Sequence, residues 1–226
     1  MTNVSLTRPL PSVAEGKRVY YGGSQHLLGR ASAGAGCGLV GAVCLMRYLA
    51  EEGKTSGDLF VRRNGEPMET DAFRALCRLL QHRYLPVLPH FGMTGPVLAL
   101  GVNRLLRKCR APYWARWCVS SGKLLPRMEE MLAADIPVVF SAGPNFPFLF
   151  GRRKLPLYRK DRDGSLQPAG GAVAHYMIAT DLQDGCMAVS SWGQEYWVRL
   201  DEYLHYVRRI SAPFLSNVLY VTPKSN

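Results

Sequence analysis

Apolar residues recur with a helical spacing through the first half of the chain. Gly38 to Ala50 (GLVGAVCLMRYLA) is apolar nearly all the way round a helix, with Arg47 as its single charge, which is typical of a helix buried on most sides. From Asp71 to about His82 the apolar residues fit one helix face and the arginines the other. Two more helices are predicted over Thr94–Lys108 and Leu124–Ala134.

Short apolar runs separated by turn residues dominate the second half. They predict strands at Arg116–Ser120, Pro137–Ser141, His175–Thr180, Met187–Ser191, Tyr196–Leu200 and Asn217–Val221, and a short helix from Asp201 to about Arg208. Residues 144–170, rich in proline and basic residues, predict a long loop. N-terminal helices packed on a C-terminal antiparallel sheet make an α+β fold.

We expect a single domain over residues 1–226, with an irregular lead-in (1–36), a mainly helical part (37–135) and a mainly β part (136–226). A content of 47% hydrophobic and 20% charged residues is typical of a globular protein. The longest uncharged apolar run with helical character, Cys37–Met46, is too short to cross a bilayer, and Met1–Gly16 has no apolar core of a secretory signal. These features predict a cytoplasmic protein without a membrane span.

The chain carries 28 Lys and Arg against 17 Asp and Glu, so the formal net charge is +11, which raises the hypothesis of a basic nucleic-acid-binding module. Most basic residues are spread through separate segments, however, and only 152–162 is a dense cluster. No helix-turn-helix, finger or aromatic-sheet motif accompanies them. A solvated basic surface is the simpler interpretation, and nucleic acid is not an expected partner.

Six cysteines are scattered without a C-x-x-C pair or a histidine at ligand spacing, which argues against zinc and against a disulfide framework. We expect free thiols, no metal and no cofactor. Cys37 differs from the others because it follows a run of small residues and lies in the first turn of the buried helix. Free N–H groups and the helix dipole favour a thiolate there. Gly36 and Gly38 leave the sulfur accessible to a substrate carbonyl. The alternative is a small core cysteine.

His175 begins an apolar strand, whereas the other histidines have ordinary polar surroundings. A buried histidine bonded to a backbone carbonyl is the usual alternative to a catalytic one. Ser190 lies 15 residues further on, at the end of the next strand, so a hairpin places it beside the ring. A Cys–His pair needs such a neighbour to hold the imidazole in one tautomer.

Four segments in this order, GCG with an apolar helix, IPVVFSAG, AHYMIATDL and VSSWGQEYWVRLDEYL, resemble the papain-like cysteine peptidase superfamily. Within it, the chain is most similar to the bacterial leader-peptide-processing branch. The resemblance covers residues 36–50 and 124–205 and implies a papain-like fold with Cys37 as nucleophile and His175 as base. The 138 residues between them suit papain-like enzymes.

The resemblance also implies an orienting Asn or Asp, but Ser190 holds that position, and a tryptophan, Trp192, packed over the His175–Ser190 contact. The oxyanion glutamine is expected where Ala31 stands, which leaves Gln25 as the upstream candidate.

The predicted activity is acyl transfer to Cys37, with hydrolysis of a peptide or amide as the main outcome. An acyltransferase and a binding protein that has lost turnover through Ser190 are the alternatives. The segment from Phe148 to Asp163 precedes the His175 strand, so Arg152 and Arg153 are candidates for selecting anionic substrates.

Overall fold

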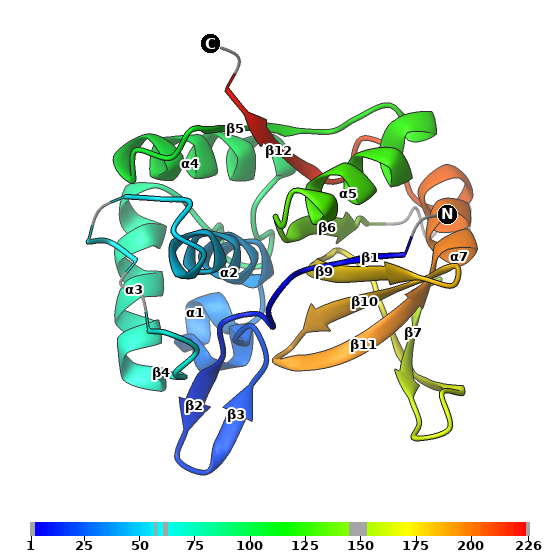
Figure 1. Ribbon diagram of the computed structural model, residues 1–226, viewed down its shortest axis with the longest axis horizontal. Coiled ribbons are helices and arrows are strands. Elements are labelled where there is room, and N and C mark those ends of the chain that lie inside the picture. Colours follow the sequence, from blue (N-terminus) through cyan, green and yellow to red (C-terminus); the bar gives the residue numbers. More distant parts are fainter. Residues whose placement is uncertain (1–2, 57, 61–62, 145–152, 225–226) are drawn as a thin grey trace.

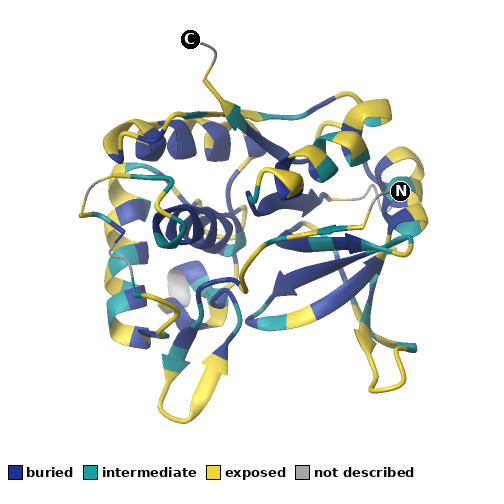
Figure 2. Cartoon of the chain, in the orientation of Figure 1, coloured by how far each residue is buried: buried dark blue, intermediate teal, exposed yellow. Residues whose placement is uncertain are grey.

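The computed structural model describes residues 3–56, 58–60, 63–144 and 153–224 as an α+β arrangement of helices and antiparallel sheets (Figure 1). A central helix, α2 (Cys37–Glu51), lies between two long helices, α3 (Thr70–Arg83) and α4 (Gly95–Lys108), and the main sheet. Figure 2 shows that it is buried along its length, whereas the neighbouring helices keep an exposed face. The predicted α+β class is therefore confirmed.

The helices follow the apolar pattern closely. Amphipathic spacing sets α3 and α4, and a basic last turn suits each helix C-terminus. The helical segments are η1 (Gln25–Leu27), α1 (Arg30–Ala33), α3 (Thr70–Arg83), α4 (Gly95–Lys108), η2 (Ser121–Lys123), α5 (Leu124–Ala133), α7 (Leu200–His205) and the π-turn η3 (Tyr206–Ile210).

The main sheet has the strand order β1-β9-β10-β11-β7-β8, and β6 also pairs with β9. Its strands are β1 (Val4–Ser5), β6 (Val138–Ala142), β7 (Leu155–Lys160), β8 (Leu166–Ala172), β9 (His175–Gln183), β10 (Cys186–Ser191) and β11 (Gln194–Arg199). Two small sheets join β12 (Leu219–Pro223) to β5 (Tyr113–Trp117), and β2 (Val13–Glu15) to β3 (Arg18–Tyr20) and β4 (Met68–Glu69).

Close packing joins α2 to the sheet. A Cβ placed on Gly41 would lie 3.0 Å from Val139 Cγ1 of β6, so the glycine allows the helix to approach the strand. Arg47, the single charge predicted for this helix, is buried and donates to the carbonyls of Pro11 and Ser12. These bonds satisfy a charge that would otherwise be costly to bury and tie the N-terminal segment to α2.

Two segments differ from the sequence expectations. Residues 153–170 of the predicted long loop include a hairpin, β7 and most of β8. Pro168 lies in β8, an edge strand of the sheet. An edge strand has no neighbour on its outer side, so the missing N–H of proline is tolerated there. The irregular lead-in contains the short elements β1, β2, β3, η1 and α1, because pairing with distant strands orders it.

Candidate active site

Cys37 is the first residue of α2, and its N-cap, Gly36, has no side chain to cap the helix. The first helical bond runs from Val40 N to Gly36 O, so the N–H groups of Cys37, Gly38 and Leu39 lie outside the helical ladder. The residue as a whole is half-buried, and it lines two adjoining cavities. A nucleophile there faces free N–H donors and the positive end of the helix dipole.

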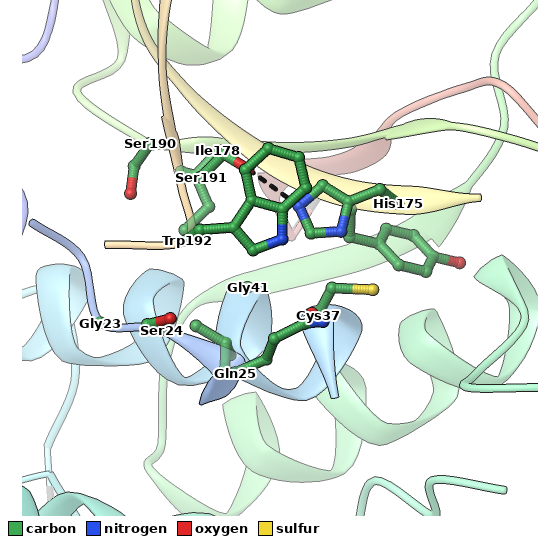
Figure 3. A pocket seen from close by; sticks show the side chains of 12 residues that line it. Gly23, Ser24, Gln25, Cys37, Gly41, His175, Ile178, Ser190, Ser191 and Trp192 are labelled. Carbon is green, nitrogen blue, oxygen red and sulfur yellow. Dashed lines mark hydrogen bonds between the residues drawn. The ribbon is translucent and has the colours of Figure 1, made fainter. Parts of the chain in front are cut away.

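His175 is the first residue of β9 and its side chain is buried. Its Nε2 lies 2.8 Å from Ser191 Oγ, and the indole of Trp192 stacks on the ring with centroids 4.5 Å apart and planes at 15°. In Figure 3, Cys37 lies across the pocket from this ring. No hydrogen bond joins the Cys37 thiol to the ring in the described part of the chain, and the ring bonds Ser191 through Nε2.

The prediction that Ser190 stands beside His175 is wrong. Ser190 Oγ donates to the carbonyl of Tyr21 at 2.8 Å, and Figure 3 shows its side chain pointing away from the imidazole. Ser190 pairs with Ile178, three positions after His175. Because side chains alternate between the faces of a strand, this register puts Ser190 on the opposite face and Ser191 on the face of the histidine.

Trp192 and Gly193 form the two-residue turn between β10 and β11, with φ of 49° and 77°. Both values lie in the left-handed region, as in the type I′ turns that favour hairpins. A tryptophan rarely adopts this backbone, and such strain is concentrated at functional sites. The turn directs the indole over His175, as the resemblance implies, although the contact that it covers is to Ser191.

Gln25 opens the short helix η1 and lines the same cavity as Cys37 and His175 (Figure 3). Its Oε1 is buried without a hydrogen-bond partner among the described atoms. Gly36, by contrast, is absent from the described lining of both cavities. A Cβ there would lie 2.7 Å from Ser32 O, so close packing requires this glycine. Its neighbours Gly34 and Ala35 line the larger cavity instead.

Burial keeps both candidate catalytic groups neutral at pH 7. It raises the pKa of the Cys37 thiol, and the backbone N–H groups of Tyr176 and Gly38 offset only part of that effect. Burial, with a smaller contribution from nearby His26, lowers the pKa of His175 from 6.5 to about 4. The expectation that the helix terminus favours a thiolate is therefore wrong for the resting protein, because desolvation outweighs the N–H groups.

The larger cavity is a groove of about 650 Å³ that extends from Cys37 and His175 between the loop before α4 and the segment before β12. The smaller one, about 20 Å³, lies between Gln25, Cys37, His175 and Trp192. Arg153 is not among the described residues that line either cavity, and Arg152 lies outside the described residues.

Sequence reasoning missed Ser191, Tyr176 and the groove loop around Phe91. The doubled serine was visible, but alternation alone could not tell which hydroxyl meets the ring. Phe91 lies in the tight turn that is closed by an isolated bridge between Leu88 and Gly92. Its 89% exposure is a signal that only the structure reveals.

Within the described residues no cluster of three or more His, Cys, Asp or Glu could hold a metal ion. No helix in the same part of the chain is long and apolar enough to span a membrane. Comparisons with protein-family models, curated proteins and solved structures find no match to this chain.

Proposed function

We propose that this chain catalyses cysteine-dependent acyl transfer, with hydrolysis of a peptide or amide bond as its main outcome. One observation carries the proposal. A single cavity is lined by a cysteine at an uncapped helix N-terminus and by a buried histidine held by Ser191 on one ring nitrogen and by Trp192 on one face. This arrangement leaves Nδ1 of His175 for proton transfer with Cys37.

In the proposed reaction, His175 Nδ1 takes the thiol proton while Cys37 Sγ attacks the carbonyl carbon. The oxyanion accepts hydrogen bonds from the Cys37 N–H and the side-chain amide of Gln25. His175 then gives the proton to the leaving amine as the C–N bond breaks and a thioester forms. Water, deprotonated by His175, hydrolyses the thioester, which releases a carboxylic acid and restores the thiol.

Because the resting pair is neutral, His175 acts as a general base during the attack and no ion pair needs to exist beforehand. The mechanism assigns Nε2–H as the donor to Ser191 Oγ, 2.8 Å away, which is the tautomer that leaves Nδ1 free to act as the base. Its hydroxyl cannot offset the imidazolium charge as a carboxylate would, so we expect slow turnover.

A binding protein with the same groove is the second candidate. Two observations favour it, the uncharged orienting group Ser191 and the raised pKa of Cys37. An acyltransferase would follow the same first step and differ only in the acceptor that attacks the thioester.

The test is acylation by p-nitrophenyl acetate, followed by p-nitrophenolate release and by mass spectrometry of the acetylated peptide. We expect Cys37 to be acetylated and to turn over at a rate nearly constant from pH 5 to 8, since His175 stays neutral above pH of about 4. His175→Ala should instead react slowly, at a rate rising about tenfold per pH unit as free thiolate forms. Cys37→Ala should show neither signal.

The matched control is Cys186→Ala, because Cys186 is also a partly exposed free thiol. This variant should react as the wild type does. Equal acetylation of Cys37 and Cys186, or a Cys37 rate unaffected by His175→Ala, would contradict the proposed catalysis.

A further inference from the structure

The groove beside Cys37 is lined by uncharged groups. Its described lining contains no Asp, Glu, Lys or Arg. The titratable groups in it are Cys37, His90, His175 and Tyr176. The apolar part of the lining is formed by Phe91, Met93, Pro96, Trp117, Val173, Trp192, Phe214 and Leu215. A volume of about 650 Å³ lies within the range of ligand sites and exceeds the space that one side chain fills.

The polar atoms of two aromatic residues in the groove are already bonded to the protein. Trp117 Nε1 donates to Phe214 O at 2.8 Å, and Tyr176 OH donates to Met93 O at 3.1 Å. The two rings also meet edge to face, with centroids 5.8 Å apart. These rings therefore present mainly hydrocarbon to a ligand and are held in place by their own contacts.

Phe91 and Phe214 are 89% and 55% exposed, although both line the groove. When a ligand covers large apolar side chains that otherwise contact water, the loss of their exposed apolar surface favours binding. A charged ligand group would lose its hydration there without an ionic partner in the described lining. The groove therefore discriminates against charge.

We propose that the groove binds an uncharged peptide segment with bulky apolar side chains, on the acyl side of the bond that Cys37 attacks. The placement of the peptide relative to an attacked bond rests on the proposed function of Cys37. The peptide character rests on Gln25, a residue that lines both cavities. Its buried Oε1 has no hydrogen-bond partner among the described atoms, so a small shift of this side chain on ligand binding would let a substrate N–H satisfy it. The proposal replaces the expected preference for anionic substrates.

The experiment compares coumarin amides of acetyl-X-X-Ala in which X is Leu, Glu or Lys. We expect kcat/KM to be at least about tenfold higher for Leu than for either charged peptide. Phe91→Ala should lower the Leu value by about 3- to 10-fold, mainly through KM. Phe91→Lys should shift the preference toward Glu.

Leu100→Ala is the matched control, because Leu100 is a 53% exposed apolar residue of α4 outside the groove lining. It should leave all three kcat/KM values unchanged. Equal rates for Leu and Glu peptides, or an equal loss in Phe91→Ala and Leu100→Ala, would overturn the groove assignment while leaving Cys37 catalysis intact.

Binding separates this inference from the proposed function. Fluorescein-labelled versions of the same peptides are titrated into Cys37→Ala and followed by anisotropy. Tighter binding of the Leu peptide than the Glu peptide supports the groove assignment even if the wild type cleaves neither peptide, in which case the proposed hydrolysis fails. Equal affinity for both peptides overturns the groove assignment.

Discussion

Replacing Ser191 by alanine tests the site most sharply, because Ser190 provides a control one residue away. Both serines are 4% exposed, and each makes a hydrogen bond of 2.8 Å. Ser191 bonds the His175 ring, whereas Ser190 bonds the carbonyl of Tyr21 on the other face of the strand. Ser191→Ala should therefore affect the reaction, and Ser190→Ala should affect only stability.

The magnitude follows from the charge on the ring. His175 becomes a cation in the transition state, and hydrogen bonds to charged groups are worth about 1.5–3 kcal/mol. Losing that bond in Ser191→Ala should lower kcat/KM by about 10- to 100-fold. Ser191→Thr keeps the hydroxyl and should stay within about threefold of the wild type. Ser190→Ala should cost about 1 kcal/mol of unfolding free energy and leave kcat/KM unchanged.

The assay is p-nitrophenyl acetate turnover at pH 7, with urea unfolding of each variant to separate kinetics from stability. If Ser190→Ala slows turnover as much as Ser191→Ala does, the assigned register and the positioning role of Ser191 are refuted. Failure of Ser191→Thr to restore the rate would likewise show that the hydroxyl is not the active feature.

Three further predictions test other parts of the structure. The folded protein keeps His175 neutral down to pH of about 4, whereas the unfolded chain binds the proton near 6.5, so stability falls as pH falls through this window. Between pH 7 and pH 4 the wild type should lose about 3 kcal/mol more unfolding free energy than His175→Gln, as measured by urea unfolding at both pH values. An equal loss in the two proteins would contradict the burial argument. Gln25→Ala should lower kcat by about 100-fold or more but leave iodoacetamide labelling of Cys37 unchanged, since alkylation forms no oxyanion; slower labelling would point to a structural role. Gly95→Ala should destabilise the fold by about 1–3 kcal/mol, because its Cβ would lie 2.0 Å from the Trp117 ring. Gly122→Ala, with nothing within 4 Å of the added Cβ, should not, and equal unfolding midpoints for the two variants would refute this packing.

Local sequence located the candidate nucleophile and base but not their partners. Cys37 was recognisable because small residues and a helix start coincide in one stretch of chain, and His175 because a titratable ring opens an apolar strand. Whether Ser190 or Ser191 bonds the His175 ring depended on the strand register, and the alternating pattern of one strand is compatible with either register. The groove depended on aromatic residues from three separate segments, Phe91, Trp117 and Phe214, that no local motif connects.

The hairpin formed by β7 and β8 illustrates the same division. Its prolines and basic residues have low strand propensity, so local reasoning predicts a loop. Antiparallel pairing satisfies its backbone groups at the end of the sheet, where solvent tolerates proline and charge.

The sequence by itself determined the buried helix that begins at Cys37, the amphipathic helices around it, the strand that begins at His175 and the α+β class. Periodicity carries this information because it records which face of each element leaves water. The tertiary structure alone decided that Ser191 holds the histidine, that burial keeps the Cys37–His175 pair neutral, and that the adjoining groove is apolar. Register, desolvation and groove shape arise from contacts between residues far apart in the chain, which no single segment encodes.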